Sequence, residues 1–143
     1  MKPLVKMVMV TLLFALPALA FGRTLWPDAP DIMQPTAGQF PFFVGVAVIE
    51  ALSFGIGMSF LLFGWSLVQK AKATEPGKMA LFLSITWLLI SWWPHDNMHR
   101  HNGMDTGGLL VIEYLFHVTL IIAAGIVAWY FWKSLPRENS TNI

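Results

Sequence analysis

Apolar residues gather in four runs along this chain, separated by short polar segments. The runs cover residues 7–21, 40–68, 79–93 and 107–132. A helix that crosses a bilayer needs roughly 20 apolar residues, so the second and fourth runs are long enough by themselves. The third run is shorter and would complete its span with Trp92 and Trp93, since tryptophan is enriched at membrane interfaces. This pattern predicts an all-α fold, a polytopic membrane bundle of three to four transmembrane helices.

The first run allows two interpretations. Lys2 and Lys6 precede its apolar part, and it ends near Ala18-Leu19-Ala20, which is typical of a secretory signal peptide with a small-residue cleavage site. The alternative is a retained first transmembrane helix, although the run is close to the shortest length that can span a bilayer. Residues 1–21 are therefore either a signal peptide or the first transmembrane helix. Both interpretations place the loop that follows on the outer side.

The basic residues are divided unevenly between the two sides that the runs define. Of the nine Lys and Arg residues, seven fall on the side of the N-terminus, and only Arg23 and Arg100 fall on the other side. Cytoplasmic loops of membrane proteins carry such an excess of positive charge. We therefore expect residues 22–135 to form one bundle with a histidine-rich outer loop at 94–106, and residues 136–143 to form a polar cytoplasmic tail. A bacterial inner membrane, with both termini in the cytoplasm if the first segment is retained, is the simplest setting.

The composition agrees with a membrane protein and excludes several other classes. Of the 143 residues, 56% are hydrophobic and 12% are charged, whereas soluble domains carry about 25% charged residues. The net charge of +1 gives no reason to expect nucleic-acid binding, so the expected partners are the lipid bilayer and either a second copy of the chain or other membrane subunits. The absence of cysteine excludes disulfides and thiolate metal sites. Neither a P-loop nor a dinucleotide-binding glycine pattern occurs.

Three of the four histidines lie in one polar stretch between the third and fourth runs. They are His95, His99 and His101. Imidazole is a ligand for zinc, copper and iron, and it also transfers protons near neutral pH. If a helix begins at Pro94, a favoured first helical residue, then His95 and His99 share a face four residues apart. The competing interpretation is a solvated interfacial loop, since this spacing matches no strong single-metal signature.

Three further polar residues interrupt the second and fourth apolar runs. They are Glu50, Glu113 and His117. A charged group inside a membrane costs several kcal/mol, which makes it a candidate for function. Glu113 and His117 share a helix face because they are four residues apart, although they could also be a neutral pair that stabilises helix packing. Stripes of small and polar residues on three runs would turn inward, and we expect Glu50, Glu113, His117 and His95 to converge in the outer half of the bundle.

Together these residues predict a transition-metal site that would hold copper, iron or zinc. The candidate ligands are His95, His99, His101, Glu113, His117 and Glu50. Asp96 and Asp105 are candidates for carboxylates that orient the ligating imidazoles. Asp105 and Thr106 are both suited to cap the next helix. Such a site would serve metal handling or redox chemistry on a lipid-soluble substrate.

Three alternatives remain open on the sequence alone. The chain could be a non-catalytic accessory subunit of a larger membrane respiratory or transport complex, because it has little material outside the membrane. It could bind b-type haem through His117 and a second histidine, from the tract or from another copy of the chain. It could also conduct protons or ions through Glu50, Glu113 and His117. The residues do not separate an enzyme from a metal chaperone.

Overall fold

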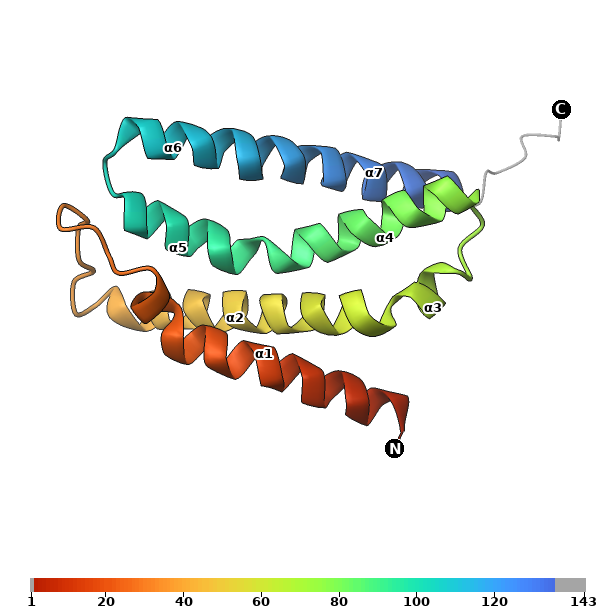
Figure 1. Ribbon diagram of the computed structural model, residues 1–143, viewed down its shortest axis with the longest axis horizontal. Helices are drawn as coiled ribbons and strands as arrows, with labels where there is room; N and C mark the ends of the chain where they lie inside the picture. Colours follow the sequence, from red (N-terminus) through yellow and green to blue (C-terminus); the bar gives the residue numbers. More distant parts are fainter. Residues whose placement is uncertain (1, 136–143) are drawn as a thin grey trace, which may run out of the picture.

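The computed structural model describes residues 2–135, and the described chain consists of helices joined by loops, without a strand. The helices are α1 (Pro3–Leu25), α2 (Phe40–Phe63), α3 (Trp65–Val68), α4 (Glu75–Ile90), α5 (Trp92–Asn102), α6 (Thr106–Ile112), η1 (Glu113–Val118) and α7 (Thr119–Ser134). The segment η1 is a π-helix, and it joins α6 to α7 in one continuous helix (Figure 1). The predicted all-α fold is confirmed. The predicted tail, residues 136–143, lies outside the described residues.

Three of the helices are long and apolar enough to cross a membrane. They are α1, α2 and the continuous helix Thr106–Ser134. These helices and the α4–α5 pair run side by side, so that α1 begins and α7 ends at the same end of the bundle (Figure 1). Many of their large apolar side chains are exposed, as Leu13 (66%) and Ile121 (72%) illustrate. Lipid can cover such surfaces in place of a protein core, so the fold has the pattern of a multi-pass membrane protein.

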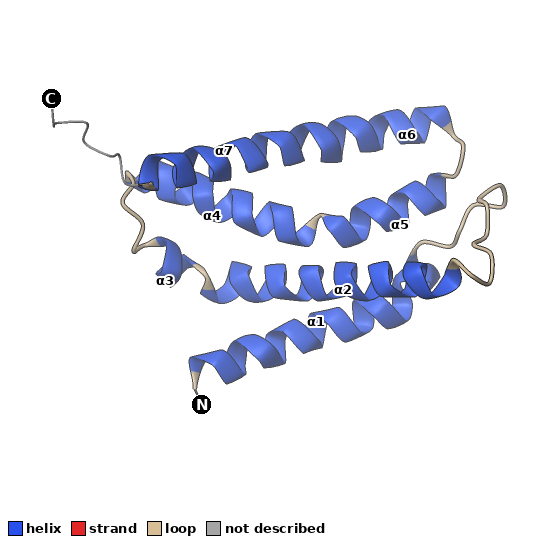
Figure 2. Cartoon of the chain, turned by 180° about the vertical axis from the view of Figure 1, so that it is seen from behind, coloured by secondary structure: helices blue, strands red, loops and turns tan. Residues whose placement is uncertain are grey.

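The third apolar run forms two helices instead of one. Pro94 has no N–H to donate to the carbonyl of Ile90, four residues earlier, and the chain is interrupted at Ser91 between α4 and α5 (Figure 2). The tract that the sequence assigned to a loop is helical as far as Asn102. It ends at Gly103, whose φ of 53° favours glycine.

The inward-facing stripe of α2 is formed by small and polar residues, as predicted. Gly57 packs against α4, where an added Cβ would lie 2.9 Å from the Cβ of Leu89. The hydroxyl of Ser53 donates to the carbonyl of Leu89 at 2.9 Å. On the side of α1, Ser59 donates to the carbonyl of Met7 at 3.2 Å. Small side chains let helix backbones approach closely within a membrane, so α2 holds α1 and α4 at short distance.

The loop between α1 and α2 fixes the far end of α5. Arg100 donates two hydrogen bonds to the Asp28 carboxylate, at 2.9 and 2.6 Å, and these bonds hold the pKa of Asp28 below its usual value. The backbone N–H of Ala29 donates to the carbonyl of Arg100 at 3.0 Å, and that of Met104 donates to Asp31 at 3.0 Å. One face of α5 is therefore held by this loop, while the face that carries His95 is directed elsewhere.

Candidate metal centre

Three histidines, two from α5 and one from η1, meet in the half of the bundle where α5 turns into α6. The Nε2 atom of His95 lies 2.9 Å from Nε2 of His117 and 3.0 Å from Nε2 of His99. One nitrogen from each ring can be chosen so that all three lie within 4.8 Å of one another. We call His95, His99 and His117 the histidine cluster. Its arrangement could hold a metal ion.

The two helices supply these side chains by different geometries. His95 and His99 are one turn apart on α5, with ring centroids 4.6 Å apart. His117 lies on the π-helix η1, whose turns are wider than those of an α-helix. Consecutive residues of η1 can therefore reach the same neighbour: the ring centroids of Phe116 and His117 lie 5.2 and 4.7 Å from that of His95. Single π turns within α-helices occur frequently at functional sites.

Glu113 contacts Nδ1 of His117, the ring nitrogen that does not face His95. Its Oε2 atom forms a very short hydrogen bond with Nδ1 of His117. When Nδ1 carries the proton and donates it to the carboxylate, the lone pair of Nε2 is directed into the histidine cluster. Carboxylates bonded to ligating histidines in this way fix ring orientation and increase ligand basicity. Glu113, predicted as a ligand, contacts the cluster through Nδ1 of His117.

Aromatic packing supports the cluster from the side of α4. Trp87 stacks on Phe116 with centroids 5.7 Å apart, and its indole N–H donates to the hydroxyl of Thr119 at 2.8 Å. That hydroxyl in turn donates to the carbonyl of Leu115. Phe116 is buried and also contacts His95. This chain of contacts fixes η1 against α4. It could not be predicted from the sequence, because no local pattern relates Trp87 to Thr119.

The spacing of the nitrogen atoms fits transition-metal chemistry. A zinc–nitrogen bond of about 2.0–2.1 Å places two ligands of a tetrahedral site about 3.3 Å apart. The two short separations in the cluster are 2.9 and 3.0 Å, so small ring rotations would create the space for an ion. Three protein ligands leave a fourth position open, which is typical of catalytic rather than structural zinc sites. Imidazole ligands without thiolate suit zinc, copper and iron.

Two other candidates from the histidine tract have different contacts. A ring nitrogen of His101, Nδ1, lies 2.9 Å from the carbonyl oxygen of Pro27, in the loop before α2. Asp105 caps α6, where its carboxylate accepts from the backbone N–H groups of Gly107 and Gly108, both at 3.2 Å. The capping role predicted for Asp105 is confirmed. Neither His101 nor Asp105 belongs to the histidine cluster.

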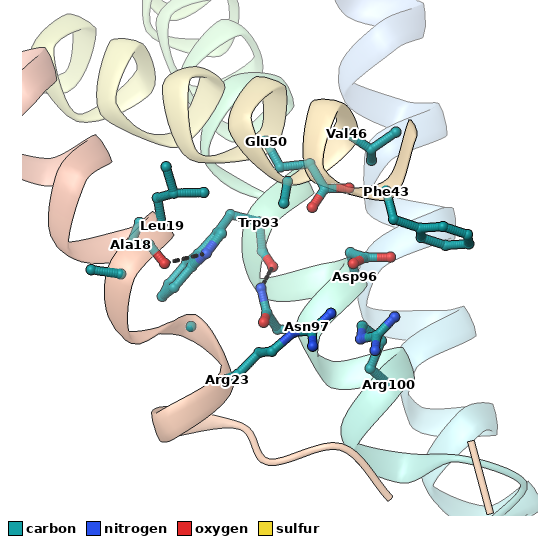
Figure 3. A pocket seen from close by; sticks show the side chains of 13 residues that line it. Ala18, Leu19, Arg23, Phe43, Val46, Glu50, Trp93, Asp96, Asn97 and Arg100 are labelled. Atoms are coloured by element: carbon teal, nitrogen blue, oxygen red, sulfur yellow. Dashed lines mark hydrogen bonds between the residues drawn. The ribbon is translucent and has the colours of Figure 1, made fainter. Parts of the chain in front are cut away.

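Glu50 and Asp96 line a cavity of about 230 Å³ between α1, α2 and α5 (Figure 3). Glu50 is 6% exposed, and Arg23 and Arg100 also line this space. The α5 residues that line it are on a different face of the helix from His95. The structure thus brings His95, Glu113 and His117 together, as the stripes predict, and adds His99, but it separates Glu50 from them.

Comparisons of the chain with protein families, curated proteins and solved structures find no match.

Proposed function

We propose that this chain is an integral membrane protein that binds one copper, iron or zinc ion through the histidine cluster. The observation that carries the proposal is the convergence of His95, His99 and His117 from two helices, with Nε2 separations of 2.9 and 3.0 Å. Three imidazoles at one point differ from the two axial ligands of a b-type haem. A continuous proton path is less well supported, because Glu50 lines a different cavity from Glu113 and His117.

The placement of the cluster suits a metal that is exchanged or that reacts with a second molecule. The side chain of His117 is 40% exposed, and the cluster lies in the half of the bundle that contains the turn from α5 to α6. The ring of His117 is therefore open to its surroundings and is not sealed within the bundle. An open fourth position would accept water, a substrate or a ligand from a partner protein. We infer metal handling or redox chemistry at the membrane as the role.

We propose that the histidine cluster faces the outside of a bacterial inner membrane. The lysines of the chain lie at the opposite end of the bundle, where α1 begins, where α3 is joined to α4, and where α7 ends (Figure 1). Positive charge of this kind favours the cytoplasmic side. We further propose that α1 stays in the mature protein as the first membrane helix, since Ala18 accepts a hydrogen bond from the indole of Trp93 at 3.1 Å.

The direct test is elemental analysis of the full chain, purified without a histidine tag in mild detergent from metal-replete cells. We expect one equivalent of copper, iron or zinc per chain. Protein that is metal-free as isolated is then dialysed against each of the three ions in turn. If it still retains none of them, the metal proposal is wrong and the accessory-subunit interpretation is favoured.

Replacing Glu113 by glutamine should weaken metal binding without removing it. The change removes the negative charge that orients His117 and increases its basicity, and loss of such a partner lowers metal affinity by about 10–100-fold. Affinity can be measured by competition with a coloured chelator. Glu75→Gln is the matched control, because Glu75 is exposed and pairs with Lys78 at the start of α4. Equal affinities of the two variants would contradict the positioning role of Glu113.

A further inference from the structure

A large cavity lies at the end of the bundle opposite to the histidine cluster. It is an open groove with a volume of about 1370 Å³, lined by α4, α7 and the loop that joins α3 to α4. Pockets for drug-sized ligands measure about 300–1,000 Å³, so this one can hold part of a larger molecule. It shares no residue with the histidine cluster.

The entrance of this cavity is positively charged. Lys70 and Lys72 reach it from the loop before α4, and Lys133 from the last turn of α7. Among the described residues that line the cavity, none is acidic. Lys78 is close in sequence but is held by Glu75 at 2.8 Å and by Gln69 at 3.3 Å. Three lysines from two separate segments therefore present their charge to one space.

The interior of the cavity is apolar. Leu81 of α4 and Ile122 and Ile126 of α7 form its walls. Gly125 also lines it, and a Cβ added at this glycine would meet no atom within 4 Å. Trp129 lies at the charged end, with its ring 4.7 Å from Nζ of Lys133. The cavity thus combines a cationic, aromatic entrance with an open apolar channel beside α7.

We propose that this cavity binds an anionic phospholipid. The lysines contact the headgroup phosphate, and one acyl chain lies along Ile122, Gly125 and Ile126. Basic pockets between membrane helices on the cytoplasmic side recognise anionic headgroups, and each basic residue near the surface contributes about 1 kcal/mol to this attraction. A free phosphate would use the lysines but would leave the apolar walls empty, so a lipid fits the whole cavity better.

Native mass spectrometry of the full chain in mild detergent tests the proposal. The probes are phosphatidylglycerol and phosphatidylcholine with identical acyl chains, added separately at increasing concentration. We expect phosphatidylglycerol to bind about tenfold more tightly, because only its headgroup has an uncompensated negative charge. Equal retention of the two lipids would overturn the proposal. Displacement of bound phosphatidylglycerol by inorganic phosphate alone, at an ionic strength matched with chloride, would instead indicate a simple anion site and would also overturn it.

Two variants separate the roles of the charged entrance and the apolar channel. Lys72→Gln combined with Lys133→Gln should lower the affinity for phosphatidylglycerol about tenfold or more. The matched control is Lys2→Gln combined with Lys6→Gln, which removes the same charge at the start of α1, away from the cavity, and should leave the affinity unchanged. Gly125→Leu should reduce binding of phosphatidylglycerol while keeping all three lysines. Unchanged binding in the cavity double variant, or in Gly125→Leu, would contradict the proposed lipid site, provided that each variant keeps the helical circular dichroism of the wild type.

Discussion

Replacing His95 by alanine is expected to abolish stoichiometric metal binding. His95 is the central member of the cluster, because its Nε2 lies within 3.0 Å of Nε2 of both other histidines. Without it, His99 and His117 remain as two rings with centroids 5.9 Å apart. Loss of a ligand should cost more than loss of an orienting partner, hence more than about 100-fold in affinity. Elemental analysis of the purified variant measures the loss directly, and a chelator titration gives its size.

The matched control for this variant is His101→Ala. His101 belongs to the same helix but contacts the carbonyl of Pro27 instead of the cluster. We expect this protein to keep its metal, and both variants to keep the helical circular dichroism and monodispersity of the wild type. A His95→Ala protein with full metal content, or a loss confined to His101→Ala, would show that the ion is bound elsewhere.

Replacing Gly55 by alanine is expected to destabilise the bundle by about 1–3 kcal/mol, the usual cost of overpacking. Gly55 lies where α2 crosses α1, and an added Cβ would overlap the backbone oxygen of Thr11 and come within 2.9 Å of the Cβ of Ala15. Because a backbone atom of α1 cannot move aside alone, the two helices must separate. A lower midpoint of thermal unfolding in mild detergent, followed by tryptophan fluorescence, would report this effect.

The same substitution at Gly45 provides the control. Gly45 is also in α2, but a Cβ added there meets no atom within 4 Å. Alanine is favoured over glycine in a helix by up to about 1 kcal/mol, so Gly45→Ala should be neutral or stabilising. If both variants unfold at the same temperature, the close contact between α1 and α2 does not contribute to stability.

Much of the fold follows from local pattern. The apolar runs predicted helices at 40–68 and 107–132, and the structure has helices over most of both ranges. The stripes of small and polar residues were predicted to turn inward, and Gly57 of α2 does pack closely against α4. The break at Ser91 was missed because hydropathy does not change there. Its cause is Pro94, three residues later; proline both favours the start of a helix and interrupts one that is already formed, and only the first effect was predicted here.

The site could be predicted only where its members are related by helix periodicity. Spacing of four residues pairs His95 with His99, and Glu113 with His117, and both pairs are in contact. The approach of α5 to η1 was inferred from inward-facing stripes, which give a direction but no distance. A stripe on α2 also does not indicate which face of α5 it will contact. Glu50 was therefore expected beside His95, although it lines a cavity on another face of α5.

The division of the cluster between α5 and η1 has a consequence for biosynthesis. Helices leave the ribosome in chain order, so His95 and His99 are already present as a pair on α5 before His117 has been translated. Two imidazoles on one helix are an incomplete ligand set, and the third arrives only with the membrane-spanning helix Thr106–Ser134. Stable metal loading would then have to follow insertion of that helix, so an ion retained with full affinity would show that α5 and η1 have already packed together.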